Sequence, residues 1–163
     1  MTVIIGIDPG SRRTGYGVIR QEGNRHIHIA NGYLNLTVLP TVAERLQQIF
    51  AGLQAVIQTY QPKEAAIEAI FMHENPASAL KLGQARGAAM VALNMPVSEY
   101  TARQVKKSVV GSGAAKKEQV QFMVSRLLNM SGALQADAAD ALAVALCHAH
   151  VRHLKHYGVG MAR

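Results

Sequence analysis

Cysteine is almost absent from this chain: its 163 residues include only Cys147, and tryptophan is missing altogether. A single thiol cannot form a disulfide within the chain, and it cannot build a cysteine-based zinc site. Such sparing use of cysteine suits a reducing cytosol, so we expect a cytoplasmic protein. We interpret Cys147 as a small, buried apolar side chain on a helix.

Long apolar runs are missing as well. No apolar stretch approaches the roughly 20 residues needed to cross a bilayer, and the N-terminal segment is typical of a core strand rather than a signal peptide. We therefore expect no association with a membrane. The length fits one domain with a sizeable core. We place this domain at residues 1–150 and expect a basic, flexible C-terminal tail at residues 151–163.

Acidic residues are scarce. The chain has 10 Asp and Glu against 17 Lys and Arg, which gives a formal net charge of +7 and a pI near 9.9. This bias favours a polyanionic partner. If several of the few acids share one site, the rest of the surface is more basic still. A basic surface around a small acidic site is what a metal-dependent nuclease requires, because it must attract phosphates and also hold cations.

The first acid of interest is Asp8. Residues 3–7 are continuously apolar, which predicts a strand buried on both faces, and Asp8 follows at its carboxyl end just before Pro9 and Gly10. A buried carboxylate costs several kcal/mol unless it is paired or binds a cation. We expect the turn at residues 9–15 to lead into a second strand that forms a hairpin with the first.

A second acid, Glu68, interrupts the apolar segment 65–70, which follows a predicted helix at residues 41–60. The pattern predicts a central strand beside the first one, so that Glu68 points toward Asp8. The alternative is an edge strand whose Glu68 faces water. Phe71 follows in the next loop, where an aromatic ring could stack on a base, although a lone Phe is more often a core residue.

The last predicted helix, residues 135–150, carries Asp137 and Asp140 on one face, one turn apart. The rest of this helix is mainly Ala, Leu and Val. Two like charges on an apolar helix repel each other and are poorly solvated, so such a pair is expected where a cation neutralises it. His148 lies about 12 Å further along the axis than Asp140, too far to share the same ion.

Asp8, Glu68, Asp137 and Asp140 thus form a predicted cluster that includes neither histidine nor cysteine. Oxygen-only ligands favour Mg²⁺ or Mn²⁺ over zinc. Two such ions about 4 Å apart would hold a phosphodiester, one activating a water and the other stabilising the leaving oxygen. The residues alone therefore predict metal-assisted phosphodiester hydrolysis on a basic protein. They do not identify the substrate.

Basic residues gather in two further regions. A predicted helix at residues 76–93 carries Gly83 and Gly87 four apart on one face, which permits close approach of another helix, within the chain or across a dimer. A basic segment at residues 103–117 surrounds a glycine-rich break and could hold a phosphodiester backbone. The candidate DNA contacts, each of which could instead be a solvated charge, are Arg12, Arg13, Lys81, Arg86, Arg103, Lys106, Lys107, Lys116 and Lys117.

Four segments occur in order and together resemble the bacterial RuvC family of Holliday-junction resolvases: IIGIDPGSRRTGYGVI, AIEAIFMHENPASALKLGQARGAA, EYTARQVKKSVVGSGAAKKEQV and QADAADALAVALCHAH. The resemblance extends to about residue 150. It implies an α/β, RNase H-like fold with a mixed five-stranded sheet flanked by helices. It also implies a homodimer that nicks two strands of like polarity symmetrically at a four-way junction, in recombination and DNA repair, alongside the RuvA–RuvB branch-migration complex.

The resemblance also implies roles for individual residues. The catalytic, metal-binding carboxylates are Asp8, Glu68, Asp137 and Asp140, with two Mg²⁺ ions that Mn²⁺ could replace. Phe71 matches the aromatic that stacks at the opened junction centre. Lys106 and Lys117 match lysines that act in backbone contact and catalysis, but the adjacent Lys107 and Lys116 leave open which of each pair acts. The helix at residues 76–93 would form the dimer. The short, His-containing tail departs from the family pattern.

Other classes of protein stay open. A different RNase H-like nuclease would share the fold and the acids but cleave RNA–DNA hybrids. A non-catalytic junction-binding module would share the basic surface, but it would not explain buried acids in three apolar segments. Sugar-kinase and actin-like ATPases open with a similar Asp-x-Gly turn. They need a second phosphate-binding glycine turn and a second domain, for which this chain has no room, so we expect no nucleotide cofactor.

Overall fold

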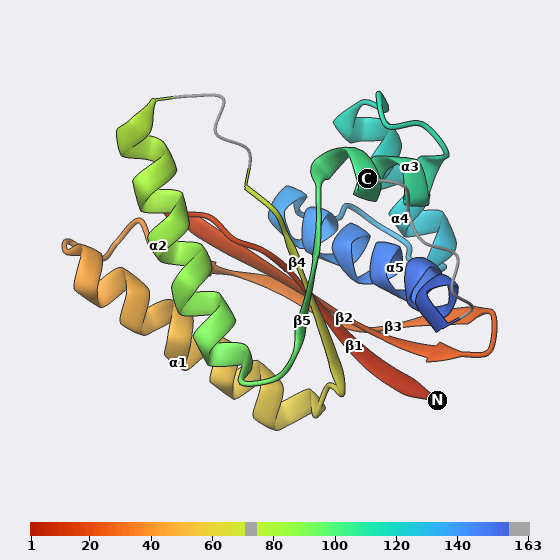
Figure 1. Cartoon of the computed structure of the whole chain (residues 1–163), viewed down its shortest axis with the longest axis horizontal. Helices are drawn as coiled ribbons and strands as arrows, with labels where there is room; N and C mark the ends of the chain where they lie inside the picture. Colours follow the sequence, from red (N-terminus) through yellow and green to blue (C-terminus); the bar gives the residue numbers. More distant parts are fainter. Residues whose placement is uncertain (71–74, 157–163) are drawn as a thin grey trace.

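Five strands form one mixed sheet with helices on both of its faces (Figure 1). The computed structural model describes residues 1–70 and 75–156, with the backbone alone for 153–156. The strand order is β3-β2-β1-β4-β5, which confirms the predicted sheet. The strands are β1 (Thr2–Asp8), β2 (Arg13–Glu22), β3 (Arg25–Asn35), β4 (Glu64–Glu68) and β5 (Val97–Tyr100). The helices within the described residues are α1 (Val42–Tyr60), α2 (Pro76–Leu93), α3 (Ala102–Val110), α4 (Lys117–Leu127) and α5 (Ala136–His156).

Strand pairing follows the predicted hairpin and extends it. β1 pairs antiparallel with β2, with Asp8 opposite Gly15, and β2 pairs antiparallel with β3 out to Arg13 and Asn35. β2 and β3 are thus longer than their apolar segments alone indicate, because backbone pairing continues through polar residues at the sheet edge. β4 runs parallel to β1, and β5 runs parallel to β4. β4 therefore lies inside the sheet, as predicted, and not at its edge.

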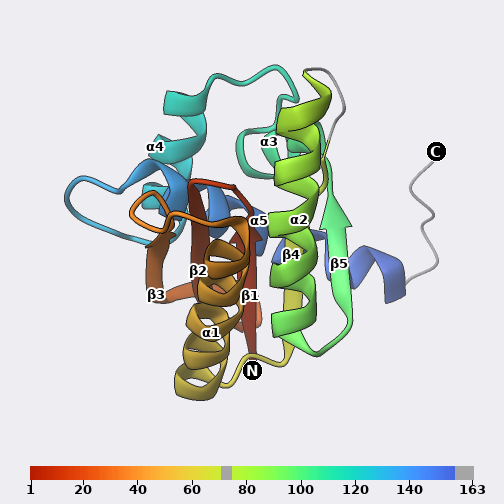
Figure 2. The ribbon, with the colours of Figure 1, turned by 90° about the vertical axis from the view of Figure 1, so that its left-hand side faces the viewer.

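Successive side chains of β1 point into two different cores, one on each face of the sheet. Ile5 and Ile7 belong to the core that α1 and α2 cover, whereas Ile4 belongs to the core beneath α3, α4 and α5. Figure 2 shows α1 and α2 in front of the sheet and α5 behind it. Gly6 allows α5 to lie very close to β1, since a Cβ atom there would be 2.2 Å from the carbonyl oxygen of Ala141.

Side-chain caps mark the starts of three helices. The Thr41 side chain accepts from the Glu44 N–H, and the Glu44 carboxylate accepts in return from the Thr41 N–H. Asn75 caps α2, and Pro76 occupies its first turn. Thr101 caps α3 in the same reciprocal way as Thr41 caps α1.

The last helix differs from the prediction at its C-terminal end. α5 continues to His156, beyond the predicted helix end at residue 150. Tertiary contacts explain the extension, because Val151 is buried and Arg152 forms an ion pair with Glu64. Cys147 is buried on α5, as predicted, and burial raises the pKa of its thiol to about 11. Across residues 1–70 and 75–156, no helix combines the length and the apolar character that a bilayer crossing requires.

Candidate active site

Asp8 and Glu68 lie at the carboxyl ends of neighbouring parallel strands. The β1–β4 register pairs Ile7 with Ile67, so the next residue of each strand is one of the two acids. Side chains alternate along a strand, and Ile4 and Ala66 both face the core beneath α5. Asp8 and Glu68 share that alternation and therefore point to the α5 face. The two strands bring together acids that are 60 residues apart in the sequence.

The first turn of α5 brings the other two acids to the same end of the sheet. Gly15, which pairs with Asp8 on β2, marks the contact: a Cβ atom there would lie 2.1 Å from the carbonyl oxygen of Asp137. Gln135 caps the N-terminus of α5, since its Oε1 accepts a hydrogen bond from the Ala138 N–H at 3.0 Å. Asp137 and Asp140 then follow on one face, as their spacing predicted.

The charges of the four acids interact. Burial raises the pKa of Asp8 to about 8, and the negative charges of Glu68, Asp140 and Asp137 add to the increase. Burial likewise raises the pKa of Glu68, followed by the charge of Asp140. The raised pKa favours the protonated Asp8 carboxyl, whose O–H can donate a hydrogen bond to the Glu68 carboxylate. The predicted convergence of the four carboxylates is thus visible in their electrostatics.

Each acid on α5 also has a partner of its own. The Lys117 Nζ lies 2.9 Å from Asp140 Oδ2, and this hydrogen bond raises the pKa of Lys117. Gln135 Nε2 donates to Asp137 Oδ2 at 2.7 Å, and an Arg13 nitrogen lies 3.9 Å from the same oxygen. Within the described part of the chain, no three Asp, Glu, His or Cys side chains are already arranged as metal ligands.

This donor set fits a hard divalent cation. It offers carboxylate oxygens alone, and its most buried member, Asp8, has too little positive charge nearby to keep it ionised. A bound divalent ion supplies that charge and reverses the effect on the pKa. Mg²⁺ and Mn²⁺ prefer such oxygen ligands.

Lys106 and Lys117 border a cavity of about 200 Å³ together with Glu68 and Asp140. Lys106 comes from α3, and Lys117 begins α4. Their neighbours Lys107 and Lys116 are exposed and do not line this cavity. The geometry therefore distinguishes the two members of each lysine pair, which the sequence left open. It favours Lys106 and Lys117 as the residues that face the acids.

On the other side of Asp137 lies a wider cavity of about 620 Å³. Arg12 and Arg13 line it from the turn after β1, and Ser78 and Leu82 line it from α2. The Arg13 guanidinium also stacks over the Tyr33 ring, 5.1 Å from its centroid. Sequence reasoning missed Tyr33, because an aromatic on a half-exposed strand carries no signal of its own. The acids thus lie between two cavities lined by basic residues.

The remaining predicted DNA contacts lie in different surroundings. Lys81 is exposed beside a cavity of about 260 Å³ between α1 and α2, and Arg103 is exposed on α3. Arg86 instead forms an ion pair with Glu99 at 2.7 Å and reaches the carbonyl oxygen of Glu68. It therefore supports the end of β4, and a DNA contact from it stays a prediction. Phe71 lies outside the described residues.

Comparisons with known proteins agree with this geometry. A family model described as crossover junction endodeoxyribonuclease RuvC matches residues 4–148. Crossover junction endodeoxyribonuclease RuvC of Psychromonas ingrahamii is 58% identical over 153 residues, which cover 92% of this chain and 88% of that protein. The RuvC of Acinetobacter baumannii is also 58% identical, over 92% of this chain and 84% of its own length.

Solved structures give the same result for the fold. A Thermus thermophilus RuvC structure in complex with a Holliday junction substrate matches with a TM-score of 0.88 and 32% identity, covering 95% of this chain and 97% of that one. Another Thermus thermophilus RuvC structure matches with a TM-score of 0.85 and 33% identity, over 94% and 96% of the two chains. The predicted RNase H-like fold is thereby confirmed. The chain belongs to the RuvC family of crossover junction endodeoxyribonucleases.

Proposed function

We propose that this protein is a structure-specific endodeoxyribonuclease that resolves Holliday junctions during homologous recombination and DNA repair. It nicks two strands of like polarity symmetrically. The observation that carries the proposal is the convergence of Asp8, Glu68, Asp137 and Asp140 at one end of the sheet, with the pKa of Asp8 raised to about 8. Such a cluster on a chain of net charge +7 suits cleavage of a polyanion.

The four carboxylates would hold two Mg²⁺ ions, for which Mn²⁺ can substitute. When bound, the ions supply an activated water and neutralise charge on the leaving oxygen. Lys117 has a different role. The hydrogen bond to Asp140 raises its pKa, so the ammonium group stays charged at neutral pH and cannot act as a base. With Asp140 serving as a metal ligand, Lys117 would be available to bind a phosphate oxygen. Lys106 would assist from the same cavity.

The exposed cations around the acids would hold the DNA backbone. Arg12 and Arg13 lie along the cavity beside Asp137, which places phosphate contacts next to the cleavage site. Phe71 would stack at the opened centre of the junction, as the family resemblance implies. We further propose that the protein acts in the cytoplasm and with a RuvA–RuvB complex. The other proposed backbone contacts are Lys81, Arg103, Lys107 and Lys116.

A homodimer would provide the two sites that symmetric nicking needs, and α2 offers the contact face. Leu80 and Val91 are exposed by 65% and 68%. Gly83 and Gly87 lie between them on the same face, and a Cβ atom at either glycine would meet nothing within 4 Å. Small residues flanked by exposed apolar side chains allow a second helix to approach closely, so we propose that α2 of one protomer packs against α2 of the other.

Gly87→Arg should dissociate this dimer without harming the fold. The position is open within the monomer, and replacing a mid-helix glycine stabilises a helix by up to about 1 kcal/mol. We expect the dimer dissociation constant, measured by sedimentation, to rise at least about tenfold, because a desolvated guanidinium at a helix contact costs more than 1.4 kcal/mol. Ala51→Arg, at an exposed position of α1, is the matched control. Unchanged dimerisation of Gly87→Arg would exclude this face.

The proposed activity is tested with labelled four-way junctions, linear duplexes and RNA–DNA hybrids in Mg²⁺. Paired nicks at equivalent positions in two junction strands, without cleavage of the duplex, are the expected result. Cleavage of the hybrid instead would identify a different RNase H-like nuclease, and tight junction binding without cleavage would identify a binding module. Junction affinity should fall steeply between about 50 and 200 mM salt. A flat salt response would contradict binding through the basic surface.

A further inference from the structure

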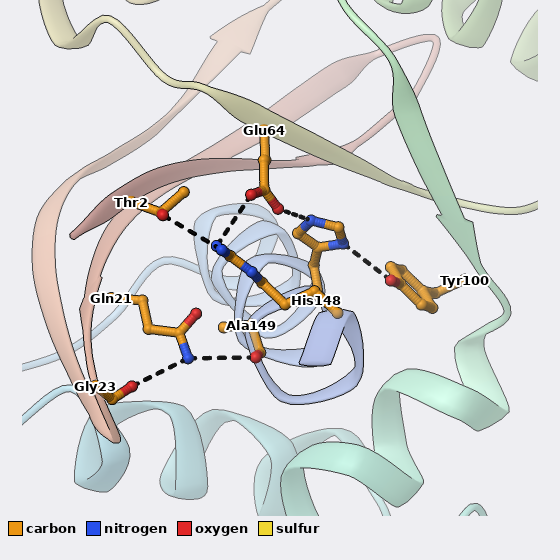
Figure 3. Close-up of polar contacts among 8 residues, drawn as sticks. Thr2, Gln21, Gly23, Glu64, Tyr100, His148 and Ala149 are labelled. Atoms are coloured by element: carbon orange, nitrogen blue, oxygen red, sulfur yellow. Dashed lines mark hydrogen bonds and ion pairs between the residues drawn. The ribbon is translucent and has the colours of Figure 1, made fainter. Parts of the chain in front are cut away.

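α5 carries a second polar cluster, in which His148 meets Glu64 (Figure 3). Glu64 and Glu68 lie at opposite ends of β4, so this cluster is at the other end of the strand from the acids. His148 and Arg152 lie four residues apart on one face of α5, and both contact Glu64, the first residue of β4. His148 is only 6% exposed. Neither residue takes part in the proposed cleavage, and His148 lies far from the acids along the helix. We call Glu64, His148 and Arg152 the α5 anchor.

Both oxygens of the Glu64 carboxylate are used. His148 Nε2 lies 2.7 Å from Oε2, and Arg152 Nη1 lies 3.1 Å from Oε1. The anchor extends to two more strands, because Arg152 Nη2 donates to Thr2 Oγ1 at 3.3 Å and His148 Nδ1 lies 2.9 Å from the Tyr100 hydroxyl. A carboxylate only accepts hydrogen bonds, so His148 donates from Nε2. The anchor thereby ties α5 to β1, β4 and β5.

The two ends of β4 stand opposite two points on α5. Glu64 and Glu68 are four residues apart on one face of the strand, about 13 Å at 3.3 Å per residue. Asp140 and His148 are eight residues apart on the helix, about 12 Å at 1.5 Å per residue. Because these lengths match, a helix held at Glu64 by His148 places Asp140 beside Glu68. α5 therefore runs antiparallel to β4, with one charged contact near each end.

The two contacts differ in their electrostatics. At the anchor, a carboxylate faces an arginine and a histidine N–H, which attracts α5 to the strands. At the other end, acidic side chains lie close together, and the ion pair of Asp140 with Lys117 ties α5 to α4 rather than to the strands. Between them α5 lies directly on glycines of the sheet, with Gly6 against Ala141 and Ala145 and Gly17 against Leu142. These apolar contacts set how closely α5 approaches the sheet, and the anchor adds directional polar contacts with the strands that favour one axial position of α5.

We propose that the α5 anchor sets the axial position of α5 on β1 and β4, and so holds Asp137 and Asp140 within reach of Asp8 and Glu68 before metal binds. His148 is then a positioning residue that acts through Asp137 and Asp140. The inference rests on the proposed role of the four acids as metal ligands. A residue that merely stabilised the fold would affect the melting temperature but leave metal affinity unchanged in the folded protein.

The test compares His148→Gln with His150→Gln. His150 lies two residues further on the same helix, but it contacts Ser108 of α3 and His26 of β3 rather than the strands that carry the acids. Mn²⁺ is titrated into each protein at a temperature where thermal unfolding shows it to be folded, and free Mn²⁺ is measured by electron paramagnetic resonance. We expect His148→Gln to weaken Mn²⁺ binding about tenfold, as for loss of an outer-shell partner, and His150→Gln to leave it unchanged.

Metal dependence of junction cleavage gives the second measurement. The Mg²⁺ concentration for half-maximal cleavage should rise by a similar factor in His148→Gln, while junction affinity stays at the wild-type value. Equal Mn²⁺ affinity in His148→Gln and wild type would overturn the inference, as would an equal loss in both histidine variants. If His148→Gln does not fold, Tyr100→Phe decides. It keeps the ring and removes the hydroxyl, which meets His148 Nδ1 and also Ser98, and it should weaken Mn²⁺ binding two- to threefold. Failure of the wild type to bind Mn²⁺ would refute the proposed function instead.

Discussion

Asp8→Asn is expected to reduce junction cleavage at least about a thousandfold while junction affinity stays within about twofold of wild type. The amide keeps the shape of the side chain but removes the charge that a divalent cation needs, and transition-state stabilisation by bound metal is worth several kcal/mol. Junction binding depends on the basic surface, which the substitution leaves intact. Cleavage rates under single-turnover conditions and a gel-shift titration measure the two quantities separately.

The same substitution should stabilise the metal-free protein at alkaline pH. The pKa of Asp8 is about 8 in the folded protein and 3.8 as the ordinary value. A raised folded-state pKa gives stability that is fully present below the unfolded value and is lost as pH rises through the folded value. Metal-free wild type should therefore lose stability between about pH 4 and pH 8. Asn does not ionise, so Asp8→Asn does not lose stability in this range. It should be roughly 2 to 5 kcal/mol more stable than wild type at pH 8.

Added Mg²⁺ should reverse this difference. Ligand that binds only the folded state raises the melting temperature, so Mg²⁺ should stabilise wild type at pH 8 and have little effect on Asp8→Asn. Glu22→Gln is the control, since Glu22 pairs with Arg20 at the far end of the β2–β3 hairpin and should change neither cleavage nor the response to Mg²⁺. An Asp8→Asn protein that cleaved junctions normally would refute the site.

The acids could be predicted from the sequence because each one interrupts an apolar segment. Asp8 ends a buried strand, Glu68 lies in a short apolar strand, and Asp137 and Asp140 share a face of an apolar helix. Burying such residues is unfavourable unless something compensates, so their positions stand out against the pattern. To bring these acids together, β1 and β4 must pair in parallel, and the helix that precedes β4 favours such pairing.

The α5 anchor could not be predicted in this way. Glu64 and His148 are 84 residues apart, and Glu64 begins its strand, where polar residues are common. Nothing in their spacing separates a buried ion pair from two solvated side chains. The same limit applies to Arg86, which matches the exposed cations in type but forms an ion pair with Glu99. Partners far apart in sequence became visible only when the sheet and α5 brought them together.

Gly15→Ala is the second substitution with a large expected effect, and its reason is steric. Gly15 lies on β2 opposite Asp8, and the added Cβ atom would be 2.1 Å from the carbonyl oxygen and 2.7 Å from the carbonyl carbon of Asp137. These are backbone atoms in the first turn of α5, so no side-chain rotation relieves the contact. The helix must move away from the sheet, and such overpacking typically costs about 1 to 3 kcal/mol of folding free energy.

The movement matters more for cleavage than for folding. A displacement of about 1 Å can cost a hundredfold in rate when it separates groups that must act together, and here it separates Asp137 and Asp140 from Asp8 and Glu68. We expect Gly15→Ala to cleave junctions at least about a hundredfold more slowly at a temperature where it is folded, and to bind Mn²⁺ more weakly. Gly83→Ala, whose Cβ meets open space, is the control for folding free energy and should not be destabilised. Wild-type cleavage by Gly15→Ala would mean that α5 need not lie against β2 at this point, and the placement of Asp137 beside Asp8 would then be wrong.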